Sequence, residues 1–127
     1  MELKRETYET KIYLDIDFDK NYFSKIDTSI GFLDHMLNTL AKYLDISLKI
    51  EAKGDTHVDY HHLIEDIGII LGKALRVEIN KDKKINRFGN ATIPMDDSLV
   101  LIALDLSGRS YLNYSVDYET LKVGNIP

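Results

Sequence analysis

The spacing of the apolar residues changes twice along this chain, from a period of two to the period of a helix. Residues 7–18 alternate between faces, which indicates a half-buried strand. Residues 31–44 then carry apolar side chains at helical spacing. Residues 46–52 alternate again, and residues 61–79 form a second helical stripe. This order restricts the chain to folds in which helices pack on a sheet.

Shorter runs suggest further strands around these four segments. We expect a short strand near residues 22–26 and three more at residues 90–94, 99–106 and 110–118. Lys81–Lys84 is expected to be a solvated connector. The sequence therefore predicts an α+β fold, with helices packed on one face of a mostly antiparallel sheet. No helical stretch follows the last strands to cover them, so we expect them to begin a second unit with an exposed apolar face.

The composition of the chain argues against several classes of protein. A net charge of −5 argues against a protein that mainly grips nucleic acid. The chain contains no cysteine, so any bound metal must use nitrogen and oxygen ligands. Residues 67–75 form the longest strongly apolar stretch, which is too short for a membrane span, and no signal peptide is evident. A cytoplasmic location is the default expectation.

Three of the four histidines lie in residues 55–66, around His61, His62 and Glu65. On a helix, His61 and Glu65 are four residues apart and share a face, so an imidazole and a carboxylate can hold one ion. His62 is rotated by about 100° and points towards a second ion or a neighbouring chain. This spacing suits manganese, iron or zinc. The alternative is a solvated, hydrogen-bonded start of a helix.

Several blocks in the same order give the chain a resemblance to the imidazoleglycerol-phosphate dehydratase family. The blocks are Arg5 with Glu9-Thr10, residues 31–37, Gly54-Asp55 with residues 59–66, Arg87-Phe88-Gly89, Pro94-Met95-Asp96 and residues 105–109. The resemblance implies a lyase of histidine biosynthesis that removes water from imidazoleglycerol phosphate to give imidazole-acetol phosphate. It also implies two Mn²⁺ ions per complete site, which favour an imidazolate form of the substrate ring. Relatives form particles of 24 subunits with sites at subunit interfaces, which implies a homo-oligomer.

Roles for individual residues also follow from the resemblance. It implies metal ligation by His35, His61, His62 and Glu65, and it makes Glu9 the acid/base for the carbon proton, with Glu65 as a second catalytic carboxylate. It implies binding of the phosphorylated substrate by four residues: Glu9, Arg87, Asp96 and Arg109. From the pattern alone, each of these would be an ordinary surface, turn or helix residue. We expect Asp59 and Asp66 to cap the helix or orient histidines, and His57 to be structural or exposed.

Family members consist of two similar half-domains. We expect residues 1–86 to form the first half-domain with its metal motif, and residues 87–127 to form part of the second. On this view the chain lacks the second metal motif, and the 127 residues alone have little or no turnover. The alternative is a non-catalytic, oligomeric metal-binding fragment of the same fold. A metal-dependent hydrolase is disfavoured by the arginines expected to bind phosphate.

Overall fold

The computed structural model describes residues 1–81, 85–118, 122 and 126. The described residues divide into two compact units, of which one contains residues 1–81 and the other residues 85–118. Of the connector expected at Lys81–Lys84, residues 82–84 lie outside the described part. None of the described helices is long and apolar enough to cross a membrane.

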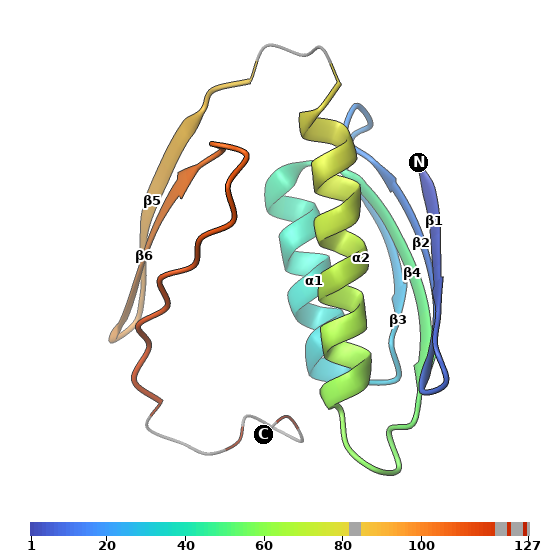
Figure 1. Cartoon of the computed structure of the whole chain (residues 1–127). Helices are drawn as coiled ribbons and strands as arrows, with labels where there is room; N and C mark the ends of the chain where they lie inside the picture. The colour runs from blue at the N-terminus through green and yellow to red at the C-terminus, as the bar shows by residue number, and fades with distance from the viewer. Residues whose placement is uncertain (82–84, 119–121, 123–125, 127) are drawn as a thin grey trace. The chain divides into compact units, whose positions relative to one another are not determined.

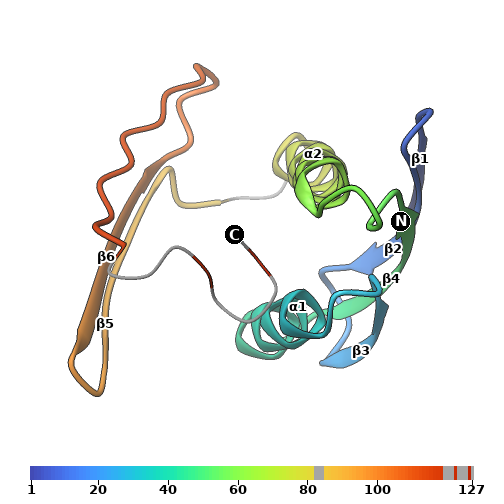
Figure 2. The same cartoon turned by 90° about the horizontal axis from the view of Figure 1, so that it is seen from below.

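The first unit is a four-stranded sheet with two helices on one face (Figure 1). The strands run in the order β1 (Glu2–Glu6), β2 (Thr10–Asp17), β4 (Ser47–Gly54) and β3 (Phe23–Asp27). Neighbours are antiparallel except β3 and β4, which are parallel. The helices α1 (Gly31–Leu44) and α2 (His61–Ile79) lie on the same side of the sheet, as Figure 2 shows. This confirms an α+β fold with a mostly antiparallel sheet.

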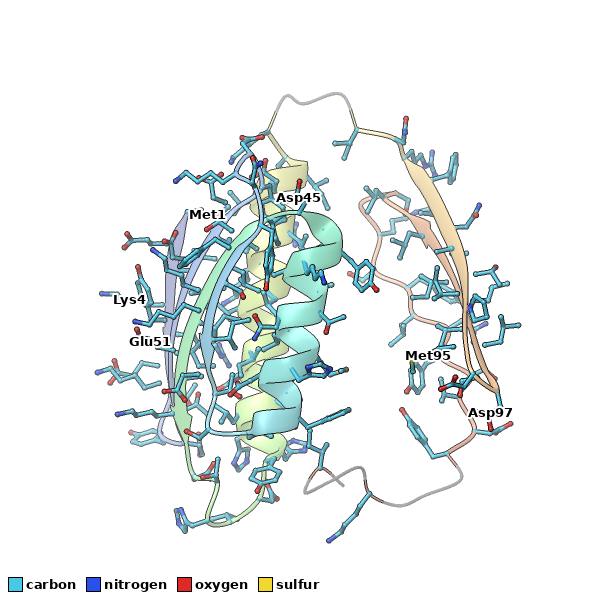
Figure 3. All side chains as sticks on the ribbon, turned by 180° about the vertical axis from the view of Figure 1, so that it is seen from behind. Met1, Lys4, Asp45, Glu51, Met95 and Asp97 are labelled. Atoms are coloured by element: carbon cyan, nitrogen blue, oxygen red, sulfur yellow. The ribbon has the colours of Figure 1, made fainter. Side chains whose placement is uncertain are left out.

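Alternation along the strands creates the core. The inward positions of β2 and β4 are almost fully buried, as are four residues of α2 and two of α1: Ile12, Leu14, Ile16, Leu48, Ile50, Ala52, Leu63, Ile67, Ile70, Ala74, Leu37 and Ala41. The opposite face of the sheet is charged, and Figure 3 shows Lys4 and Glu51 pointing away from the helices. A sheet with one apolar and one charged face can bury only the first, which places both helices there.

Both helices begin at the same end of the sheet (Figure 1). The start of α1 is held by Asp34, whose carboxylate accepts hydrogen bonds from the backbone N–H and the hydroxyl of Thr28, at 2.9 and 2.6 Å. The start of α2 is held by Asp59, whose carboxylate accepts the N–H of His61 at 2.8 Å. The Asp59 contact satisfies an N–H of the first turn of α2, whereas Asp34 ties α1 to the residues that precede it. The start of α2 therefore has a fixed place beside the ends of β2 and β4.

The second unit contains a hairpin of β5 (Phe88–Met95) and β6 (Ser98–Asp105). Asp96 lies in its tight turn with φ of 51°, a conformation that aspartate tolerates better than most residues. Every residue of the two strands is exposed, including Ile93 and Leu101. The expected exposed apolar strands are therefore present among the described residues.

Several expected element boundaries were wrong. Residues 7–18 were expected to form one strand, but residues 7–9 make the turn between β1 and β2, and Tyr8 is fully exposed. The strand β1 was missed because its sequence, Glu2–Glu6, is mostly charged. Residues 110–118 do not form the expected strand. The expected short strand is β3, and the two predicted helices have the predicted bounds.

A candidate metal and acid–base site at the start of α2

The first turn of α2 presents the two side chains that the helical spacing predicted to share a face. His61 Nε2 lies 3.1 Å from Glu65 Oε2, and the two side chains are 68% and 57% exposed. An imidazole nitrogen and a carboxylate oxygen thus converge at one point that solvent and ligands can reach. Asp59, which holds the N–H of His61, has the capping role expected of it.

His62 points in a different direction from His61. The two rings stand edge to face, with an interplanar angle of 89° and centroids 5.5 Å apart. His62 Nδ1 lies 3.0 Å from Asp55 Oδ2. This hydrogen bond raises the pKa of His62 above its ordinary value; partial burial opposes the shift, and the charges of Asp55, Glu9 and Asp59 add to it.

Glu9 lies in the turn between β1 and β2, close enough for its charge to act on His62. Its backbone is held on both sides, because its N–H donates to the Thr7 hydroxyl at 3.2 Å and its carbonyl accepts the N–H of Asp55 at 3.1 Å. Its side chain is exposed. Glu9 and Gly54 both line a shallow hollow of about 330 Å³. The backbone of Glu9 is therefore held by hydrogen bonds while its side chain remains exposed to solvent.

Asp66 of α2 connects the helix to Arg5 of β1 and Thr10 of β2. Its buried carboxylate lies 2.7 Å from Nε and 2.6 Å from Nη2 of Arg5, and it accepts the Thr10 hydroxyl at 2.5 Å. Burial alone would raise the pKa of Asp66, but the bonds from Arg5 and Thr10 outweigh it and hold the pKa below its usual range. We expected Asp66 to cap the helix or orient a histidine, and that was wrong. It pairs with an arginine because β1, which the sequence did not reveal, brings Arg5 next to it.

The donors at the start of α2 have the right chemistry for a divalent metal but form an incomplete set. Imidazole nitrogen with carboxylate oxygen suits Mn²⁺, Fe²⁺ or Zn²⁺. Within residues 1–81 and 85–118, however, no three histidine, aspartate or glutamate side chains come together in a group that could hold an ion. Among the described residues, His61 and Glu65 are thus a pair of potential donors, and two donors alone do not complete a coordination shell.

The two other histidines, His35 and His57, lie on other segments than α2. His35 is exposed on the first turns of α1, at the end of the sheet where α2 also begins. Its backbone carbonyl accepts the hydroxyl of Thr39 at 2.9 Å. His57 is exposed on the turn between β4 and α2, in keeping with a structural or exposed residue.

Three residues expected to bind substrate lie in the second unit. Arg87 makes a bidentate contact with Asp105: Nε lies 2.7 Å from Oδ1 of the aspartate, and Nη2 lies 3.1 Å from Oδ2. This pairing raises the pKa of Arg87 and lowers that of Asp105. Arg109 is exposed, with its N–H 3.4 Å from the Ser107 hydroxyl, and Asp96 occupies the turn of the hairpin. Among these three residues, Arg87 has its guanidinium paired with a carboxylate.

Two contributors to the site escaped sequence reasoning. Asp55 was quoted as part of a family block without a role, although it contacts both His62 and the backbone of Glu9. Arg5 was quoted as part of a family block without a role, and it neutralises Asp66. The available signal for Asp55 was an acidic residue in the turn directly before the histidine motif. The signal for Arg5 was absent, because its partner lies 61 residues away.

Comparisons with known proteins identify the family to which this chain is similar. Residues 28–127 match the family model described as imidazoleglycerol-phosphate dehydratase. The chain is 46% identical over 125 residues to the imidazoleglycerol-phosphate dehydratase of Acetivibrio thermocellus, covering 98% of this chain and 64% of that protein. It is 47% identical over 124 residues to that of Streptococcus sanguinis, with coverage of 98% and 64%. The chain thus spans about 64% of the length of these relatives.

Two solved structures are similar to the whole chain. The dehydratase from Staphylococcus aureus subsp. aureus N315 matches with a TM-score of 0.81 and 36% identity, over 99% of this chain and 70% of that one. The Pyrococcus furiosus protein in complex with (S)-C348 matches with a TM-score of 0.78 and 44% identity, over 94% and 63%. At 36% and 44% identity, the chain is similar to these proteins in sequence as well as in fold.

Proposed function

Because the chain belongs to the imidazoleglycerol-phosphate dehydratase family, we propose that the protein removes water from imidazoleglycerol phosphate to give imidazole-acetol phosphate. The supporting observation is the start of α2, where His61 and His62 diverge beside Glu9. Divergent imidazoles can hold two separate ions, which suits a substrate that is itself an imidazole with two ring nitrogens. This reaction would make the protein a lyase of histidine biosynthesis.

The proposed site includes a divalent metal, with Mn²⁺ as the first candidate. His61 with Glu65 would hold one ion, and His62 with His35 would hold another, through neutral imidazole nitrogens and a carboxylate oxygen. A bound cation would withdraw electrons from the substrate ring and make its neighbouring carbon proton easier to remove.

Glu9 is the proposed group that takes the carbon-bound proton. Its exposed carboxylate and fixed backbone allow it to reach a substrate without moving the turn. Glu65 is the second candidate carboxylate for proton transfer, at 3.1 Å from His61. Arg87, Asp96 and Arg109 are assigned to substrate binding, because a guanidinium matches the geometry of a phosphate dianion.

We further propose that the protein is a homo-oligomer whose sites lie at subunit interfaces. The incomplete donor set supports this, since His61 and Glu65 are both exposed and provide only two donors. The exposed apolar strands β5 and β6 supply surface that association could bury. Light scattering at micromolar concentration with Mn²⁺ present is expected to report an assembly, and a stable monomer would contradict the proposal.

Genetic complementation with a matched variant tests the proposed activity. The gene that encodes this chain would be expressed in a strain that lacks the dehydratase, with Glu9→Gln as a variant that keeps the size of the side chain. We expect growth without histidine for the natural gene and none for Glu9→Gln.

Metal binding to the purified chain separates the remaining outcomes. If Mn²⁺ binds through His61 but no product forms, the result favours the non-catalytic metal-binding alternative. If soluble, folded chain neither binds Mn²⁺ nor yields product with imidazoleglycerol phosphate, the proposed function is wrong.

A further inference from the structure

We propose that Asp55 is a positioning residue, which fixes the ring of His62 so that Nε2 faces a divalent cation and at the same time holds the backbone of Glu9 beside it. The proposal rests on the proposed function in one respect, because it takes His62 to be a metal ligand. It adds a residue that links the proposed ligand to the proposed acid/base. The sequence motif of histidines and glutamate does not contain this residue.

Asp55 has contacts in three directions. Its N–H donates to the carbonyl of Glu9 at 3.1 Å, and its own carbonyl accepts the N–H of Val58 at 2.8 Å. Its Oδ2 lies 3.0 Å from Nδ1 of His62. The backbone of Asp55 is thus held by the turn between β1 and β2 on one side and by the turn before α2 on the other. Its side chain, 19% exposed, is directed at the imidazole of His62.

The end of β4 and the start of α2 are also packed too closely to shift independently. A Cβ atom on Gly54 would lie 3.3 Å from two side-chain atoms of Leu63 and 3.4 Å from the carbonyl of Glu9. Leu63 is fully buried next to His62 in the sequence. The residues on either side of the Asp55–His62 contact therefore belong to elements that fix one another.

This contact selects one form of the neutral imidazole. An ionised carboxylate can only accept a hydrogen bond, so Nδ1 of His62 must carry the proton. The lone pair of the neutral ring is then on Nε2, the nitrogen on the far side from Asp55. Partners of this kind orient metal-binding histidines, and their loss commonly weakens metal binding by about 10- to 100-fold.

Asp59 provides a matched control within the same loop. Its charge also acts on His62, but its carboxylate is bonded to the N–H of His61 instead of the ring of His62. If only the negative charge near His62 mattered, both aspartates would contribute. If the contact with Nδ1 matters, Asp55 alone would determine the tautomer and orientation of the His62 ring.

The test reads the tautomer of His62 directly by ¹⁵N NMR on the metal-free chain at about pH 9, where the imidazole is largely neutral. We expect the Nδ1–H form in the natural sequence and a mixture in Asp55→Ala. Asp59→Ser, which keeps a capping oxygen, should retain the Nδ1–H form. Asp55→Leu, which has a side chain of similar size without an acceptor, serves if the alanine variant does not fold. An Nε2–H form in the natural sequence, or an unchanged tautomer in a folded Asp55→Ala chain, would overturn the proposal.

Titration calorimetry with Mn²⁺ separates this proposal from the proposed function. We expect Asp55→Ala to weaken binding by about 10- to 100-fold, and Asp59→Ser to change it much less. If His62→Ala weakens binding but Asp55→Ala does not, the positioning role is wrong and the ligand assignment stands. If His62→Ala leaves binding unchanged, His62 is not a ligand, and the metal-directed part of the proposal falls with that assignment.

Discussion

The ion pair of Arg5 and Asp66 should show an asymmetry that depends on which partner is removed. The Asp66 side chain is 9% exposed, whereas that of Arg5 is 27% exposed. After Asp66→Leu, the guanidinium can turn towards water. After Arg5→Leu, the carboxylate stays buried with only the Thr10 hydroxyl at 2.5 Å and a longer contact from Thr7 at 3.5 Å. We therefore expect Arg5→Leu to be the more destabilising change.

The magnitude follows from the contacts that are lost. Removing one partner of a buried ion pair costs about 3–5 kcal/mol. Asp66→Leu should lie near the lower end, at about 3 kcal/mol, because the remaining arginine is partly hydrated. Arg5→Leu should approach about 5 kcal/mol at neutral pH, because an unpaired carboxylate remains. The double variant should cost less than the sum of the two by about 2 kcal/mol or more, since no unpaired charge is left.

Urea unfolding followed by circular dichroism, at neutral and acidic pH, measures these differences. The pKa of Asp66 is lowered in the folded chain, so its stabilising contribution is present above the ordinary carboxyl pKa of about 3.9 and is lost as the pH falls through the folded value. The gap between the natural chain and Arg5→Leu should therefore narrow below about pH 3.9. If Asp66→Leu proves the more costly variant, or if the two effects add within 0.5 kcal/mol, about the usual scatter for independent sites, the reasoning from burial is refuted.

Three further predictions concern the packing and the site. Gly54→Ala should destabilise the chain by about 1 kcal/mol and Gly54→Val by about 3 kcal/mol in urea unfolding, because buried Leu63 cannot move aside; equal stability for all three would contradict this. His61→Ala should remove Mn²⁺ from the purified chain, measured by plasma emission, while the exposed His57→Ala should not; the reverse would disprove the ligand assignment. The raised pKa of His62 stabilises the metal-free chain below about pH 6.5, and this stabilisation should decline as the pH rises through the folded pKa. In thermal unfolding, His62→Gln should abolish this dependence of stability on pH.

The pattern of apolar residues was sufficient to predict both helices and the general class of fold. Helical spacing over 14 and 19 residues is long enough to exclude a strand, so the bounds of α1 and α2 were predictable. The pairing of His61 with Glu65 followed from the same local geometry. Local interactions determine these features, which is why the sequence alone reveals them.

Shorter and more polar segments were not predictable in this way. The strand β1 is half exposed and mostly charged, so its pattern carries little hydrophobic signal, and it forms because its backbone pairs with β2. Residues 110–118 have the composition of a strand but no pairing in the described structure. A strand depends on partners that are distant in the sequence, so alternation alone cannot decide whether it forms.

The sequence by itself determined which side chains share a face at the start of α2, and the tertiary structure decided which contacts hold them. Asp55 contacts His62 and Glu9 only because β2 begins beside the end of β4, at the pair Thr10 and Gly54. Asp66 binds Arg5 across 61 residues because β1 joins the same sheet. Hydrogen bonds and ion pairs of this kind require a separation of about 3 Å. Sequence spacing fixes such a distance within one helical turn, but between elements only the packed fold does.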